Sequence, residues 1–114
     1  MGNALMARFL RSALDAGVEL WRNSPAITLR SQGGRVTGVV VQRGGRTSEI
    51  SVRRGVVLAS GGFSANPQMR AKYIPYAEHH VSLTPEGNTG DGLSMALALG
   101  AVMEEKNFQN GAWC

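Results

Sequence analysis

Residues 26–53 read AITLRSQGGRVTGVVVQRGGRTSEISVR. Within this stretch, three runs suited to β-strands, 26–30, 35–42 and 47–53, are separated by two glycine pairs. Paired glycines favour tight hairpin turns because they adopt the positive φ angles that these turns require. The pattern therefore predicts a three-stranded antiparallel β-meander.

A nearly continuous apolar run, GVVLAS at 55–60, follows the meander and ends at a Gly-Gly pair. Strands that are buried on both faces have this composition, as in parallel sheets. We therefore expect a buried strand over residues 55–60. A shorter apolar stretch, VELW at 18–21, predicts another strand before the meander.

Three helices are expected around these strands. Residues 3–16 carry apolar side chains at three- and four-residue intervals, which predicts an amphipathic helix. A short helix is expected over 66–74, where Asn66 precedes Pro67 as a candidate N-cap. A third helix is expected over 91–100. Together, these helices and strands indicate an α/β fold.

The composition is that of a folded protein, with 114 residues of which 43% are hydrophobic and 18% are charged. No apolar run reaches the roughly 18 residues that a membrane span requires, so none is expected. A single cysteine, Cys114, excludes an internal disulfide and favours a reducing compartment, here the cytoplasm. The adjacent pair His79-His80 has no evident third ligand, so no metal site is expected.

The first candidate site is the turn Ala59-Ser60-Gly61-Gly62, which follows the expected buried strand. Ligands of open α/β sheets bind just beyond the carboxyl ends of strands. Two glycines there would let a ligand approach the backbone, because no Cβ intervenes. The alternative is an ordinary tight turn without a ligand.

The second candidate site is the sequence GNTGDG at 87–92, which opens the third helix. The N-terminus of a helix presents unpaired amide groups that bind anions. Asp91 would repel a phosphate, however, and is better suited to accept hydrogen bonds from ligand hydroxyls. The alternative is that Thr89 or Asp91 caps the helix.

Taken in order, four motifs resemble one family: NALMARFLRSALDAGVEL, GRVTGVVV, VVLASGGFSAN and GNTGDGLSMALALGA. The whole chain resembles part of the FAD-binding domain of the fumarate reductase/succinate dehydrogenase flavoprotein superfamily, which includes soluble ketosteroid dehydrogenases. That family writes the third motif V-L-A-T-G-G-F and the fourth T-G-D-G-x-x-M-A-x-x-x-G-A. The resemblance implies a partial, Rossmann-like FAD-binding domain with an inserted antiparallel meander. It also implies an FAD-dependent oxidoreductase that moves a hydride between a substrate carbon and the flavin.

The resemblance assigns cofactor-binding positions but no catalytic ones. Asp91 matches the family aspartate that lies against FAD, and Ala26 matches a position whose backbone meets the adenine. The turn around Ser60 matches the A-T-G-G turn, with serine in place of threonine. The FAD-binding residues implied in this way are Ala26, Ser60, Gly61, Gly62, Thr89, Gly90, Asp91 and Gly92.

Two departures from the family pattern qualify this expectation. The dinucleotide fingerprint G-x-G-x-x-G is missing, so residues 1–114 resemble an interior segment that lacks both that N-terminal unit and the substrate domain. Such a segment should bind FAD weakly or not at all by itself. Where dicarboxylate-reducing members carry His-Pro-Thr, residues 109–113 read QNGAW, which points to a less polar small-molecule substrate.

Two other functions remain as alternatives at this point. One is a non-catalytic α+β module that assembles as a homo-oligomer, which uncovered apolar faces would favour. The other is a nucleic-acid-binding domain, suggested by 12 Lys and Arg against eight Asp and Glu. The basic residues are scattered along the sequence without interleaved aromatics, so nucleic acid is not the expected partner.

Overall fold

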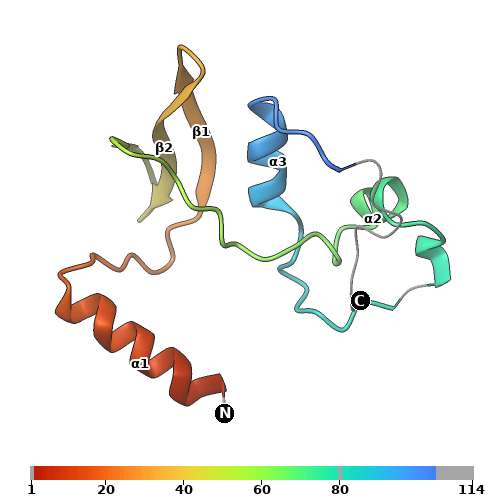
Figure 1. Cartoon of the computed structure of the whole chain (residues 1–114), viewed down its shortest axis with the longest axis horizontal. Coiled ribbons are helices and arrows are strands. Elements are labelled where there is room, and N and C mark those ends of the chain that lie inside the picture. The colour runs from red at the N-terminus through yellow and green to blue at the C-terminus, as the bar shows by residue number, and fades with distance from the viewer. Residues whose placement is uncertain (1, 80, 105–114) are drawn as a thin grey trace.

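The computed structural model describes residues 2–79 and 81–104. Its three helices and three strands follow the order expected from the sequence (Figure 1). In chain order they are α1 (Gly2–Asp15), β1 (Ala26–Gln32), β2 (Arg35–Arg43), β3 (Arg46–Ser51), α2 (Pro67–Tyr73), a 3-10 turn (Ala77–His79) and α3 (Asp91–Ala98).

The sheet is the antiparallel meander that the glycine pairs predicted, with strand order β1-β2-β3. Its two hairpins are closed by two residues each, because Gln32 pairs with Arg35 and Arg43 pairs with Arg46. All four turn glycines have positive φ, between 55° and 77°. These angles match the turns whose twist suits antiparallel strands.

The buried core of the described residues is small. Leu29, Val40, Val41 and Ile74 are its buried hydrophobic side chains. The radius of gyration is 16.4 Å, against about 13 Å for a compact domain of this length. Much of the apolar surface is therefore open, and α3 lies beside the edge strand β1 (Figure 1).

Two sequence expectations are wrong in this structure. Residues 18–21 and 55–60 form no strand, and most of their apolar side chains are exposed, with Val57 at 91% and Leu20 at 60%. A strand requires a hydrogen-bonded neighbour, and the described residues offer these two segments none. The apolar runs therefore mark surfaces that nothing in the described part of the chain covers.

Helix α1 shows the same lack of cover. Among the described residues, no other helix or strand packs against it, and Figure 1 shows it standing apart from the sheet. Its apolar face is exposed to solvent at Leu5, Met6, Phe9, Leu10 and Leu14. None of the helices in the described part of the chain, α1 included, has the length and apolar character that a bilayer span requires.

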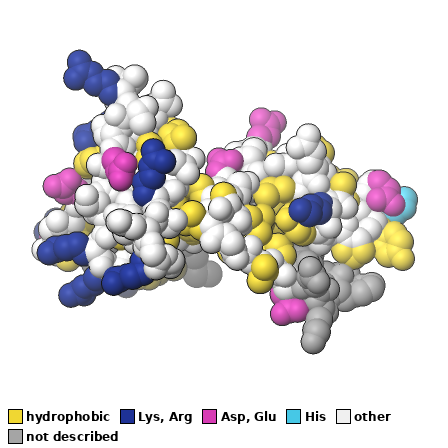
Figure 2. All heavy atoms as spheres, turned by 90° about the horizontal axis from the view of Figure 1, so that it is seen from above, with side chains coloured by type: hydrophobic (Ala, Val, Ile, Leu, Met, Phe, Trp, Pro, Cys, Tyr) yellow, Lys and Arg dark blue, Asp and Glu magenta, His cyan; other side chains and the backbone are white. Residues whose placement is uncertain are grey.

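Charge is unevenly distributed over the surface. Seen from above, Lys and Arg side chains gather over the half that holds the sheet, whereas hydrophobic side chains are open over the half that holds α2 and α3 (Figure 2). Some of the basic groups have partners: Arg30 lies 3.6 Å from Glu49, and the Arg43 guanidinium lies 4.3 Å from the ring centroid of Trp21.

The open face of α1 should drive self-association of the 114-residue chain. Phe9→Lys should raise the dissociation constant of the self-associated form at least about tenfold, since burying such a side chain contributes roughly 1.5–3 kcal/mol. Ala4→Lys adds the same charge on the polar side of α1 and should change this dissociation constant little. Sedimentation velocity over a concentration series measures both, and equal effects of the two variants would contradict the expectation.

Candidate functional site

The two glycine motifs lie directly against each other. The Gly90 amide donates to the Gly62 carbonyl at 3.0 Å, and the Ala65 amide donates to the Asn88 carbonyl at 2.9 Å. These backbone hydrogen bonds join segments that are more than 20 residues apart in the sequence. The turn after the apolar run and the loop before α3 therefore form one structural unit, which we call the glycine junction (residues 59–66 and 87–92).

Close packing explains why several positions in the glycine junction are glycine. Gly92 is buried, and a Cβ there would collide with the Ser60 hydroxyl. A Cβ on Gly61 would collide with the Asn88 side chain in the same way. Ser60, Gly61 and Gly62 are thus held against the loop that leads into α3.

Helix α3 begins at Gly90 without a side-chain cap. Gly90 has φ +83°, a left-handed conformation that glycine adopts without strain. The Thr89 hydroxyl instead donates to the Asp91 carboxylate at 2.9 Å. The capping alternative for Thr89 and Asp91 is therefore wrong, and the exposed Asp91 carboxylate remains available at the first turn of α3.

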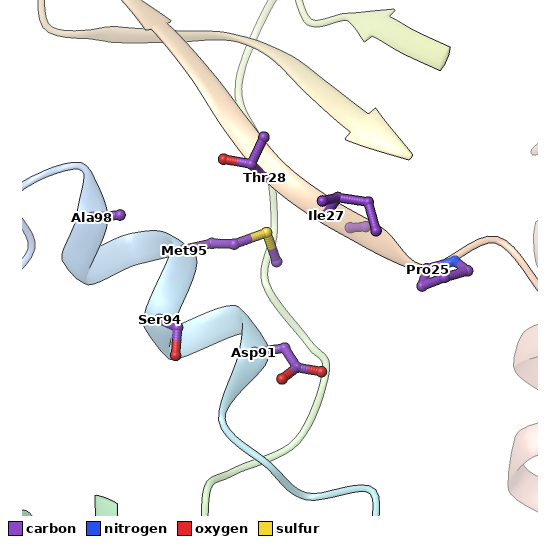
Figure 3. Close-up of a pocket in the computed structure, with 8 residues that line it drawn as sticks. Pro25, Ile27, Thr28, Asp91, Ser94, Met95 and Ala98 are labelled. Carbon is purple, nitrogen blue, oxygen red and sulfur yellow. The ribbon is translucent and has the colours of Figure 1, made fainter. Parts of the chain in front are cut away.

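A groove of about 430 Å³ runs between the start of β1 and helix α3 (Figure 3). Figure 3 shows the Met95 side chain reaching toward β1, with the Asp91 carboxylate near the end of the groove at Pro25. Eight residues line it: Pro25, Ala26, Ile27, Thr28, Asp91, Ser94, Met95 and Ala98. Asp91 is the one ionisable side chain among them, so the groove combines apolar walls with a single carboxylate.

The implied FAD-binding residues fall into two groups in the structure. Ala26 and Asp91 line the groove itself. The other six, Ser60, Gly61, Gly62, Thr89, Gly90 and Gly92, belong to the glycine junction that leads into α3 and do not line the groove. Sequence reasoning missed Met95 and Asn66. The methionine is marked by its spacing in α3, four residues after Asp91, whereas Asn66 shows only the signal of a helix cap.

The one described residue of the histidine pair lies outside the groove and the glycine junction. His79 is exposed and lies 3.7 Å from the Glu78 carboxylate. Within residues 2–79 and 81–104, no three His, Cys, Asp or Glu side chains are grouped as metal ligands would be. His80, Cys114 and the stretch 109–113 lie outside the described residues.

The groove has apolar walls and one carboxylate, and comparison with known proteins gives the family of the chain. A model of the FAD binding domain matches residues 1–114, the whole chain. The chain belongs to this family. It is a segment of the FAD-binding domain of the fumarate reductase and ketosteroid dehydrogenase flavoproteins, and its cofactor is FAD, as its motifs predicted.

Two curated relatives of this FAD-binding segment are named dehydrogenases. It is 40% identical over 98% of its length to the 4-oxocyclohex-2-ene-1-carboxylate 5-dehydrogenase of Sinomonas cyclohexanicum, of which it spans 19%. It is 49% identical over 64% of its length to the 3-oxosteroid 1-dehydrogenase of Comamonas testosteroni, of which it spans 13%. The chain thus spans less than a fifth of the length of these relatives.

Solved structures show the same likeness. The 3-ketosteroid delta1-dehydrogenase of Sterolibacterium denitrificans, in complex with 1,4-androstadiene-3,17-dione, superimposes with a TM-score of 0.69 and 45% identity. That alignment covers 79% of this chain and 17% of the other. A flavocytochrome c3 fumarate reductase superimposes with a TM-score of 0.69 and 33% identity, covering 81% of this chain and 16% of the other. The fold is therefore a part of a flavoenzyme fold.

Gly90→Ala should disrupt the glycine junction. Its Cβ would lie 2.8 Å from Phe63 Cβ and collide with the Met69 sulfur. Because these contacts add to the strain of a left-handed φ, we expect a loss of about 1–3 kcal/mol in the free energy of unfolding. The matched control is Gly87→Ala, which meets nothing within 4 Å. Urea denaturation of the full-length protein measures both, and equal stabilities would contradict the packing described above.

Proposed function

We propose that this chain forms the part of an FAD-dependent oxidoreductase that holds the cofactor between β1 and α3. The observation that carries the proposal is the groove itself. Ala26 and Asp91 line it, although 65 positions separate them in the sequence, and the glycine junction adjoins it through α3. A non-catalytic module or a nucleic-acid binder would not require that arrangement, and the dehydrogenase relatives do not favour either.

The residues of the groove fit the chemistry of FAD. A carboxylate accepts hydrogen bonds from hydroxyls, which the ribityl and ribose parts of FAD supply. The hydrogen bond from the Thr89 hydroxyl fixes the orientation of the Asp91 carboxylate. Strand β1 is an edge strand, so backbone groups on its α3 side have no strand partner among the described residues. Those groups at Ala26 would meet the adenine edge.

The apolar wall has a separate role. Ile27 and Met95 face the groove from opposite sides (Figure 3). They would cover the ring systems of the cofactor and exclude water from it. When bound, FAD supplies the acceptor for a hydride from a substrate carbon, while the protein supplies binding, orientation and electrostatics.

We propose a cyclic ketone as the substrate class of the full-length protein. Two relatives are named for dehydrogenation of an oxocyclohexene carboxylate and of 3-oxosteroids. A carbonyl activates the neighbouring carbon for proton removal, which allows a carbon–carbon double bond to form beside it as the hydride leaves. The described residues carry no identified catalytic acid or base, and such groups would come from the rest of the protein.

Location and assembly are also proposals. One cysteine in 114 residues fits the reducing cytoplasm. The open apolar faces of α1 and of residues 55–58 fit a homo-oligomer or cover by further parts of the same flavoprotein. A small molecule, rather than nucleic acid, is the proposed partner.

The full-length protein should purify with a flavin absorbance spectrum that a cyclic 3-ketone bleaches under anaerobic conditions. The 114-residue chain should bind added FAD weakly or not at all, because it supplies one wall of the site. Fumarate, tested with the chemically reduced protein, is the control substrate and should not restore the oxidised spectrum. A colourless full-length protein without affinity for FAD would contradict the proposal.

Asp91→Ala should lower the FAD affinity of the full-length protein about tenfold, the effect of one hydrogen bond to a charged group in an open site. The fold should be unchanged, since the Asp91 side chain is exposed. Glu86→Ala removes an exposed carboxylate from the same loop, outside the groove lining, and serves as the control. Fluorescence titration of the apoprotein with FAD measures both, and an unchanged affinity in Asp91→Ala would sink the assignment.

A further inference from the structure

Asn66 makes contacts in two directions with one side-chain amide. Its oxygen Oδ1 accepts from the amides of Gln68 and Met69, each at 3.1 Å, and so caps helix α2. Its nitrogen Nδ2 donates to the Thr89 carbonyl at 2.9 Å, across 23 positions in the sequence. The side chain is half-buried. One planar group therefore ties the start of α2 to the loop that precedes α3.

Thr89 links Asn66 to Asp91, because it accepts a hydrogen bond from Asn66 and donates one to Asp91. Thr89 donates from its hydroxyl to the Asp91 carboxylate at 2.9 Å. Rotation of the Thr89 backbone would move that hydroxyl, and the bond from Asn66 opposes such rotation. Hydrogen bonds thus connect the N-terminus of α2, through the Asn66 amide and Thr89, to the Asp91 carboxylate that lines the groove.

The backbone bonds of the glycine junction do not replace this contact. They fix Asn88 and Gly90 on either side of Thr89, and the Thr89 amide donates to the Gly87 carbonyl at 2.9 Å within the same loop. A second side-chain tie, Ser64 to Thr84, anchors the loop five residues before Thr89. The Asn66 amide therefore joins Thr89 itself to the start of α2, which those contacts do not do.

We propose that Asn66 is a positioning residue for FAD, which sets the orientation of the Asp91 carboxylate through Thr89. The inference rests on the proposed role of Asp91 in FAD binding. An amide suits both contacts because its oxygen accepts from α2 while its separate nitrogen donates to Thr89, whereas a serine hydroxyl would have to serve both directions from one atom. A residue that merely caps α2 needs the acceptor alone, and Ser or Asp would serve equally well.

This difference allows a clean test on the full-length protein. Asn66→Ser and Asn66→Asp both keep a good N-cap for α2, but neither retains the amide donor. The serine variant is neutral, so it separates the loss of the donor from an added charge near Asp91. FAD affinity is measured by fluorescence titration of the apoprotein, alongside the unfolding midpoint, in the wild-type and Asp91→Ala backgrounds.

We expect Asn66→Ser to weaken FAD binding about three- to tenfold, the effect of one hydrogen bond, with an almost unchanged unfolding midpoint. In the Asp91→Ala background the same substitution should have no further effect on affinity, because its influence passes through that carboxylate. Asn66→Asp should weaken binding at least as much as Asn66→Ser.

Three outcomes would overturn the inference. Unchanged affinity in Asn66→Ser, while Asp91→Ala weakens binding, would reduce Asn66 to a helix cap and leave the proposed function intact. Equal losses from Asn66→Ser in both backgrounds would mean that its effect does not pass through Asp91. An Asp91→Ala variant with normal affinity would remove the proposed function and, with it, the role of Asn66.

Discussion

The backbone hydrogen bond from the Gly90 amide to the Gly62 carbonyl, 3.0 Å long, brings the two halves of the site together. Together with the bond from the Ala65 amide to the Asn88 carbonyl, it joins the turn that follows the apolar run to the loop before α3. With it, α3 starts from a fixed point and extends beside β1 (Figure 1). The groove between them, with Ala26 on one wall and Asp91 on the other, is a consequence of that placement.

The other described residues contribute little to holding this arrangement. Four hydrophobic side chains form the buried core of the described residues, and α1 packs against none of the other elements there. Polar contacts near the site are single hydrogen bonds of 2.9 Å, from Asn66 to the Thr89 carbonyl and from the Thr89 hydroxyl to Asp91. The described residues therefore form a groove on a scaffold whose apolar faces are largely uncovered, in a chain that spans 19% of one curated relative.

Local features of the fold could be predicted from the sequence, and long-range ones could not. The glycine pairs at 33–34 and 44–45 dictate hairpins by their backbone freedom, and the spacing in residues 3–16 dictates a helix. The apolar run at 55–60 predicted a buried strand wrongly, because burial depends on a partner that the run itself does not encode. Asn66 shows the same limit: its cap is a local pattern, but its bond to Thr89 crosses two loops.

The central claim is that FAD lies in the groove between β1 and α3 with a hydroxyl against Asp91. A crystal structure of the full-length protein with bound FAD tests it most directly. We expect cofactor density in this groove, with an Asp91 carboxylate oxygen about 2.5–3.0 Å from an FAD hydroxyl. FAD bound at another face, with the groove filled by protein side chains and Asp91 hydrogen-bonded within its own loop alone, would contradict it.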